Sequence, residues 1–72
     1  MGMMTPTDIK AIRVALGLEH EEFAARLGVS ANTVYRWELG DRHPNYGRQA
    51  KLNVLAAEAR RAGKLRGKLT GV

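Results

Sequence analysis

Apolar residues recur along the chain at helical spacing, in segments that are separated by glycine or proline. Ile9, Ile12 and Leu16 occupy positions i, i+3 and i+7, which places them on one face of a helix. Three further segments with an apolar side cover about residues 19–27, 30–39 and 45–61. No stretch alternates between apolar and polar residues as a half-buried strand does. The pattern therefore predicts an all-α protein.

Residues at the ends of these segments match the chemistry of helix ends. Thr5 suits an N-cap, Pro6 the first helical position and Asp8 the acid of a capping box. Ser30 suits the N-cap of the third helix. Because glycine tolerates the left-handed backbone conformation found at many helix ends, the first three helices are expected to end at Gly17, Gly28 and Gly40.

The second and third predicted helices are separated only by Gly28, Val29 and Ser30. Two helices joined by so short a turn cross steeply, in the arrangement called a helix-turn-helix. Ala24 has the small side chain that lets the third helix pass close over the second. The space between the helices is predicted to be filled by Phe23, Leu27, Val29, Val34 and Trp37.

The segment IRVALGLEHEEFAARLGVSANTVYRWELGDRHP resembles the helix-turn-helix domains of the phage Cro and repressor type, and the resemblance covers about residues 5–59. It rests above all on Arg13, Gly17-Leu18, Phe23-Ala24, Leu27-Gly28-Val29-Ser30, Trp37-Glu38, Gly40 and Pro44. The stretch RWELGDRHP is similar to the antitoxin-associated branch of the family. The resemblance implies a compact four- to five-helix bundle of the lambda-repressor-like type, whose third helix lies in the major groove of DNA.

The outer side of the third helix carries the candidate base-reading residues. With a turn of about 100° per residue, Asn32 and Arg36 fall about 160° and 200° from the inward Val34. Asparagine can pair bidentately with adenine, and arginine with guanine. Thr33 and Tyr35 flank them, and for these two simple exposure is as plausible as contact with a base or a phosphate. Polar residues on an exposed helix are often merely solvated, but the surrounding helix-turn-helix favours base reading for Asn32 and Arg36.

Other residues are candidates for contact with DNA phosphates. The resemblance places His20 where family members often have a phosphate-binding glutamine, and Glu19 where serine or threonine usually caps the helix. Arg48 can bind phosphate, or its stem can pack beside Leu52 and Leu55. Ser30 can offer its hydroxyl or the helix N-terminus, and the start of the fourth helix can offer backbone N–H groups. The candidate phosphate contacts are His20, Ser30, Arg42, Arg48 and Tyr46.

Arg13 and Glu38 are assigned to structure. The resemblance implies that they form a partly buried ion pair between the first helix and the end of the third. Neither is expected to contact DNA.

Composition limits the remaining possibilities. The chain has 72 residues, no cysteine and a formal charge of +5, with a pI of about 10.3. Residues 1–59 contain seven basic and seven acidic side chains, so the whole excess lies in residues 60–72. We expect one domain over residues 5–59, a basic, frayed tail over 60–72, and a disordered N-terminus or expression scar over 1–4. The tail can follow the DNA backbone or simply remain solvated.

Catalytic and metal chemistry find no support in the sequence. His20 and His43 lie in separate segments without partner ligands, and no nucleophile stands near a base. We therefore expect no enzyme activity, no metal and no cofactor. No signal peptide or apolar run of membrane-spanning length occurs, so a cytoplasmic protein without a membrane partner is expected.

These observations predict a sequence-specific regulator of transcription that binds double-stranded DNA and represses by occupying an operator. Because one recognition helix contacts few base pairs, a homodimer on a two-fold symmetric operator is expected. Ala50, Val54 and Ala57 form a weak outer stripe on the fourth helix, either a dimer surface or helix filler. Two alternatives remain: an antitoxin-type autoregulator with a toxin partner, and a helix-turn-helix used for protein–protein interaction.

Overall fold

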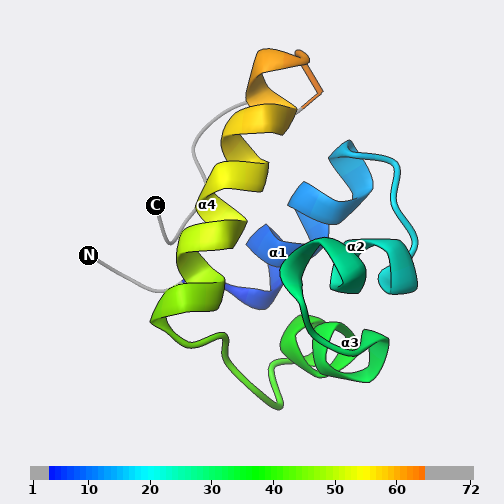
Figure 1. Cartoon of the computed structure of the whole chain (residues 1–72), viewed down its shortest axis with the longest axis vertical. Coiled ribbons are helices and arrows are strands. Elements are labelled where there is room, and N and C mark those ends of the chain that lie inside the picture. Colours follow the sequence, from blue (N-terminus) through cyan, green and yellow to red (C-terminus); the bar gives the residue numbers. More distant parts are fainter. Residues whose placement is uncertain (1–3, 65–72) are drawn as a thin grey trace.

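The computed structural model describes residues 4–64 and contains four helices within them. They are α1 (Pro6–Ala15), α2 (His20–Leu27), α3 (Ala31–Leu39) and α4 (Tyr46–Arg61). The described residues include no strand, so the all-α prediction is confirmed. In Figure 1, α4 stands along one side of the molecule and α3 lies at the lower end.

Short-range hydrogen bonds set both ends of α1. The Thr5 hydroxyl accepts from the Asp8 N–H at 3.2 Å, and the Asp8 carboxylate accepts from the Thr5 N–H at 3.0 Å. This is the predicted capping box, in which each residue satisfies a backbone donor of the other. At the other end Gly17 has φ +69°, and the Leu18 N–H donates to the Arg13 carbonyl at 3.2 Å. The chain therefore leaves α1 through a Schellman-type turn.

The turn between α2 and α3 has the predicted three residues. Gly28 has φ +72°, a conformation that other residues adopt only with strain, and its N–H donates to the Ala25 carbonyl. Ser30 caps α3, because its hydroxyl accepts from the Thr33 N–H at 3.2 Å. Ala24 is buried beside this turn, which agrees with the need for a small side chain there.

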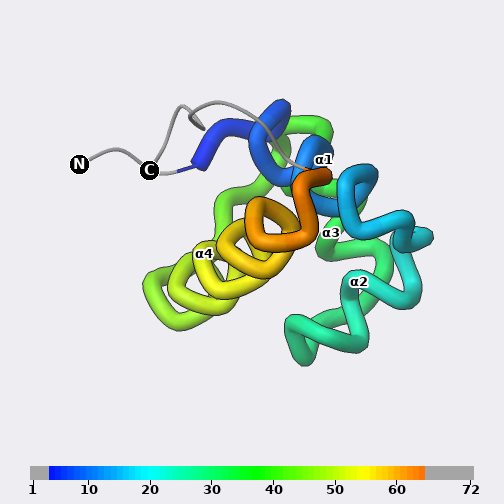
Figure 2. Tube along the Cα trace, turned by 90° about the horizontal axis from the view of Figure 1, so that it is seen from above, coloured from blue at the N-terminus to red at the C-terminus, as the bar shows by residue number. Residues whose placement is uncertain are grey.

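One apolar cluster holds the helices together. Its buried members are Met4, Ile9, Ile12, Phe23, Ala24, Leu27, Val34, Trp37, Leu52, Leu55 and Ala56. Both α1 and α2 pack against α3, and both also pack against α4. In Figure 2, seen from above, α4 lies on one side of the molecule and α2 on the other. The outer side of α3 is exposed.

Both limits of the domain move outward from the expected ones. Met4 was assigned to a disordered N-terminal segment, but it is only 2% exposed and its N–H donates to the Gln49 side chain at 3.1 Å. Residues 60–64 were assigned to the tail; Arg60 and Arg61 end α4, as the helix expected over about 45–61 requires, and the Lys64 N–H then donates to the Ala59 carbonyl at 3.0 Å. The expectations for residues 1–3 and 65–72 lie outside the described residues.

Candidate nucleic-acid interface

The two sides of α3 differ sharply in exposure. Val34 and Trp37 are buried in the core, whereas Asn32, Tyr35 and Arg36 are exposed. The Arg36 side chain makes no ion pair or hydrogen bond with other described residues. The side chains able to read base pairs therefore stand on the free side of the helix.

Thr33 takes a different position from its neighbours. It is half-buried, and its hydroxyl oxygen lies 2.9 Å from that of Ser30. The two hydroxyls bond to each other at the start of α3, so both belong to the helix cap. This leaves Asn32, Tyr35 and Arg36 as the exposed candidates for base contact.

A groove lies between α3 and the start of α4, and we call it the α4-side groove. It has a cavity volume of about 440 Å³. Its ionisable lining side chains are three arginines and one histidine. The lining residues are Val29, Asn32, Thr33, Arg36, Trp37, Arg42, His43, Asn45 and Arg48. Concentrated positive charge on a groove wall favours a polyanion.

The three arginines of this groove are held differently. Arg42 is exposed, and its side chain has no partner among the described residues. Arg48 is half-buried, and its Nη2 donates to the Gly28 carbonyl at 3.4 Å, which ties α4 to the end of α2. Arg36 and Arg42 are therefore the freer cations, while Arg48 also braces the helix-turn-helix.

The start of α4 adds backbone donors beside this groove. The Asn45 side chain caps the helix by accepting from the Arg48 N–H at 2.9 Å. The first N–H groups of any helix lack a partner within the helix, and here they include those of Tyr46 and Gly47. Tyr46 itself is almost fully exposed. These donors match the anion-binding chemistry of a helix N-terminus.

A second groove lies between the start of α2 and α3, and we call it the α2-side groove. Its cavity volume is about 600 Å³. Glu19, Glu21, Ala31 and Tyr35 line it together with His20 and Asn32. Asn32 therefore borders both grooves. Its two glutamates make the charge of this second wall negative, whether His20 is neutral or protonated.

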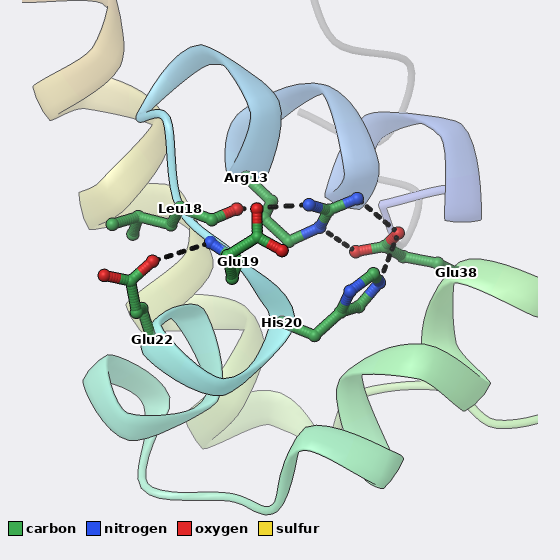
Figure 3. Close-up of polar contacts among 6 residues, drawn as sticks. All are labelled: Arg13, Leu18, Glu19, His20, Glu22 and Glu38. Atoms are coloured by element: carbon green, nitrogen blue, oxygen red, sulfur yellow. Dashed lines mark hydrogen bonds and ion pairs between the residues drawn. The ribbon is translucent and has the colours of Figure 1, made fainter.

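Arg13 and Glu38 form a partly buried ion pair next to His20, which lines the α2-side groove (Figure 3). The Arg13 guanidinium donates from Nε to Glu38 Oε2 at 2.8 Å and from Nη2 to Oε1 at 3.2 Å. Its third nitrogen, Nη1, donates to the Leu18 carbonyl at 3.1 Å. The side chains of Arg13 and Glu38 are only 11% and 8% exposed. The pair thus joins α1, the turn after it and the end of α3.

His20 does not stand free as a phosphate ligand. Its Nε2 lies 3.3 Å from Glu38 Oε1, as Figure 3 shows, and its ring packs edge-to-face on Tyr35 with centroids 5.7 Å apart. Sequence reasoning missed this contact and the bond from Arg48 to Gly28. Both contacts join residues that are distant in sequence, so no local sequence pattern predicts them.

Comparison with known proteins places the chain in a family. The family model described as Helix-turn-helix matches residues 9–52, which is more than half of the chain. The protein belongs to the Cro/C1-type helix-turn-helix family. No curated protein and no solved structure matches it.

Because this helix-turn-helix family binds DNA, the exposed side of α3 can be interpreted as part of a DNA-binding surface. Within the motif α3 is the second helix, the one that enters the major groove in such domains. Among residues 4–64 no helix has the length and apolar character needed to cross a membrane. The same residues contain no group of three His, Cys, Asp or Glu side chains placed to hold a metal ion.

Proposed function

We propose that the protein is a sequence-specific regulator of transcription that represses by occupying an operator in double-stranded DNA. The observation that carries the proposal is the juxtaposition of Asn32 and Arg36, exposed on α3, with the arginine-lined α4-side groove. Side chains that can read base edges thus stand beside cations that can hold the DNA backbone.

In this proposal α3 lies in the major groove and its outer side reads base pairs. Arg36 donates to guanine O6 and N7, and Asn32 pairs with adenine N6 and N7. Neither side chain is committed to another described residue. Tyr35 is exposed on the same helix and adds a contact to a base or a sugar.

The α4-side groove positions the backbone. Arg42 supplies a free cation, and the N–H groups of Tyr46 and Gly47 supply neutral donors beside it. Contacts of this kind fix the register of a protein on DNA but carry no sequence information themselves. In this proposal α3 recognises the base sequence, and the segment after α3 binds the phosphates.

Selectivity calls for a second copy of the chain. One helix reads too few base pairs to select a site, so we propose a dimer on half-sites one helical turn apart. Ala50 and Val54 are exposed on α4, away from the core. This outer side of α4 is the surface that we assign to the dimer.

Selection of the purified protein against random duplex DNA at near-physiological salt, followed by sequencing, tests the proposal. We expect enrichment of a two-fold symmetric site. Binding without enrichment would contradict base reading and leave only phosphate contacts. No binding at all would favour a helix-turn-helix that contacts proteins, such as a toxin partner.

A further inference from the structure

His20 lies between the partly buried ion pair and the exposed side of α3. Its Nε2 is 3.3 Å from Glu38 Oε1, and its ring contacts that of Tyr35. The side chain is 33% exposed and lines the α2-side groove beside Asn32. One imidazole therefore contacts both the Glu38 carboxylate, as Figure 3 shows, and Tyr35 on the candidate base-reading surface.

The charges around His20 come from three helices. Arg13 of α1 neutralises Glu38 of α3, so these two groups and a neutral imidazole together carry no net charge. Protonation of His20 raises that net charge to +1. Glu19 and Glu21, at the start of α2, line the same groove and add two negative charges to it. A single proton thus changes the charge of this wall.

We propose that DNA binding by this protein takes up a proton at His20, so that its affinity for DNA rises as the pH falls. The inference rests on the proposed function, in which α3, whose Asn32 and Tyr35 line the α2-side groove, lies in the major groove of DNA. A nearby polyanion favours the charged imidazole, and by reciprocity the charged imidazole favours the polyanion. Histidine is the side chain whose charge ordinarily changes between pH 5 and 8.

The contacts of the ring suit this role. Glu38 stands beside Nε2 and forms a salt bridge with it once the ring is charged. The other nitrogen, Nδ1, has no partner among the described residues, so after protonation it can donate to water or to DNA. The edge-to-face contact with Tyr35 holds the ring in the groove. The added charge therefore stays at the wall that faces DNA.

Binding to the selected duplex, measured by fluorescence anisotropy from pH 5.5 to 7.5 at fixed ionic strength, tests the proposal. The wild-type affinity should be about threefold to tenfold higher at the acidic end, the effect of one added charge near phosphates in screening salt. His43, the other histidine, lines the α4-side groove, so the reference protein is His43→Gln, in which His20 is the sole histidine of the chain. His43→Gln should keep a pH dependence, and adding His20→Gln, which keeps a neutral hydrogen-bonding side chain, should give a flat profile.

Calorimetry in buffers of different ionisation enthalpy provides a second measurement, which does not depend on the folding of His20→Gln. The His43→Gln protein should take up protons on binding DNA, up to one per subunit. A flat profile for His43→Gln, no proton uptake by His43→Gln, or the same pH dependence in His43→Gln with and without His20→Gln would each overturn the proposal. Sequence-specific binding with a flat profile would leave the proposed function intact, whereas absence of binding at every pH would contradict that function first.

Discussion

The two grooves beside α3 share Asn32 but differ in the charge of their other walls. The α4-side groove has Arg36, Arg42 and Arg48 on its walls, whereas the α2-side groove has Glu19 and Glu21. A DNA duplex against α3 would therefore be attracted on one side and repelled on the other. Repulsion can fix the orientation of a ligand as effectively as attraction does.

The difference arises from what each side chain does in the fold. On the α2 side, Glu22 accepts the Glu19 N–H at 2.9 Å, and Glu38 is held by Arg13 and His20. On the α4 side, Arg36 and Arg42 hold nothing within the described residues. Acidic residues next to the α2-side groove thus hold the fold together, whereas two of the three arginines of the α4-side groove are available to bind DNA.

Removing the carboxylate behind the α2-side groove should have the largest effect. Glu38→Ala leaves the Arg13 guanidinium buried without its partner, so the free energy of unfolding should fall by about 3 kcal/mol. Urea denaturation measures this change. The matched control is Glu58→Ala, which breaks the pair with Arg26 at 3.0 Å, where the side chains are 49% and 44% exposed. That loss should stay below about 1 kcal/mol, and equal losses would show that burial does not distinguish the two pairs.

Arg36→Ala should have the next largest effect, and it acts on DNA binding. Loss of a bidentate contact to guanine should weaken binding to the best site by about 1–3 kcal/mol and relax choice at one base pair. Titration of duplexes that differ at single positions measures both changes. Lys10→Ala removes one charge from α1, outside both grooves, and should leave the preferred site unchanged. If both variants behaved alike, Arg36 would contribute only its charge.

Arg42→Ala should weaken binding without changing the preferred sequence. Because we assign Arg42 to a phosphate, its loss should lower affinity for all duplexes alike and reduce the slope of log affinity against log salt by about 1. Measuring the affinity for DNA at four salt concentrations gives this slope. A change in base preference would mean that the α4-side groove reads sequence as well as anchoring the backbone.

Glu21→Gln should have the smallest effect and the opposite sign. Removing a negative charge from the α2-side groove should tighten binding about twofold to fivefold at low salt, where charges about 10 Å apart still interact. Glu22→Gln is the control, since Glu22 does not line the groove and glutamine also serves in a capping box. An unchanged affinity for Glu21→Gln would contradict the claim that the α2-side groove repels DNA.

Local chemistry explains why most of the fold was predictable. The ends of α1 and α3 depend on residues within four positions of one another, as in the Thr5–Asp8 box and the Ser30 cap. One local signal was overlooked: Met4 and Ile9 stand at the positions of a hydrophobic staple around the N-cap, and both are in the core. That pattern predicts that Met4 belongs to the domain.

The candidate site was predictable only in part, because tertiary contacts decide how its side chains are used. Helical periodicity places Asn32 and Arg36 outward without reference to any other helix. The contact of His20 with Glu38 and the bond from Arg48 to Gly28 depend on how α2, α3 and α4 meet. The opposite charges of the two grooves follow from the same packing. They could not be predicted from the net charge of residues 1–59, which is zero.

Parallel selection of the wild type, Asn32→Ala and Arg36→Ala from one random duplex pool tests the central claim most directly, namely that the outer side of α3 reads base pairs. The account predicts that the wild type enriches a two-fold symmetric site and that each variant relaxes a different position within the half-site, with the other positions unchanged. The same site with the same preference at every position in all three proteins would contradict it.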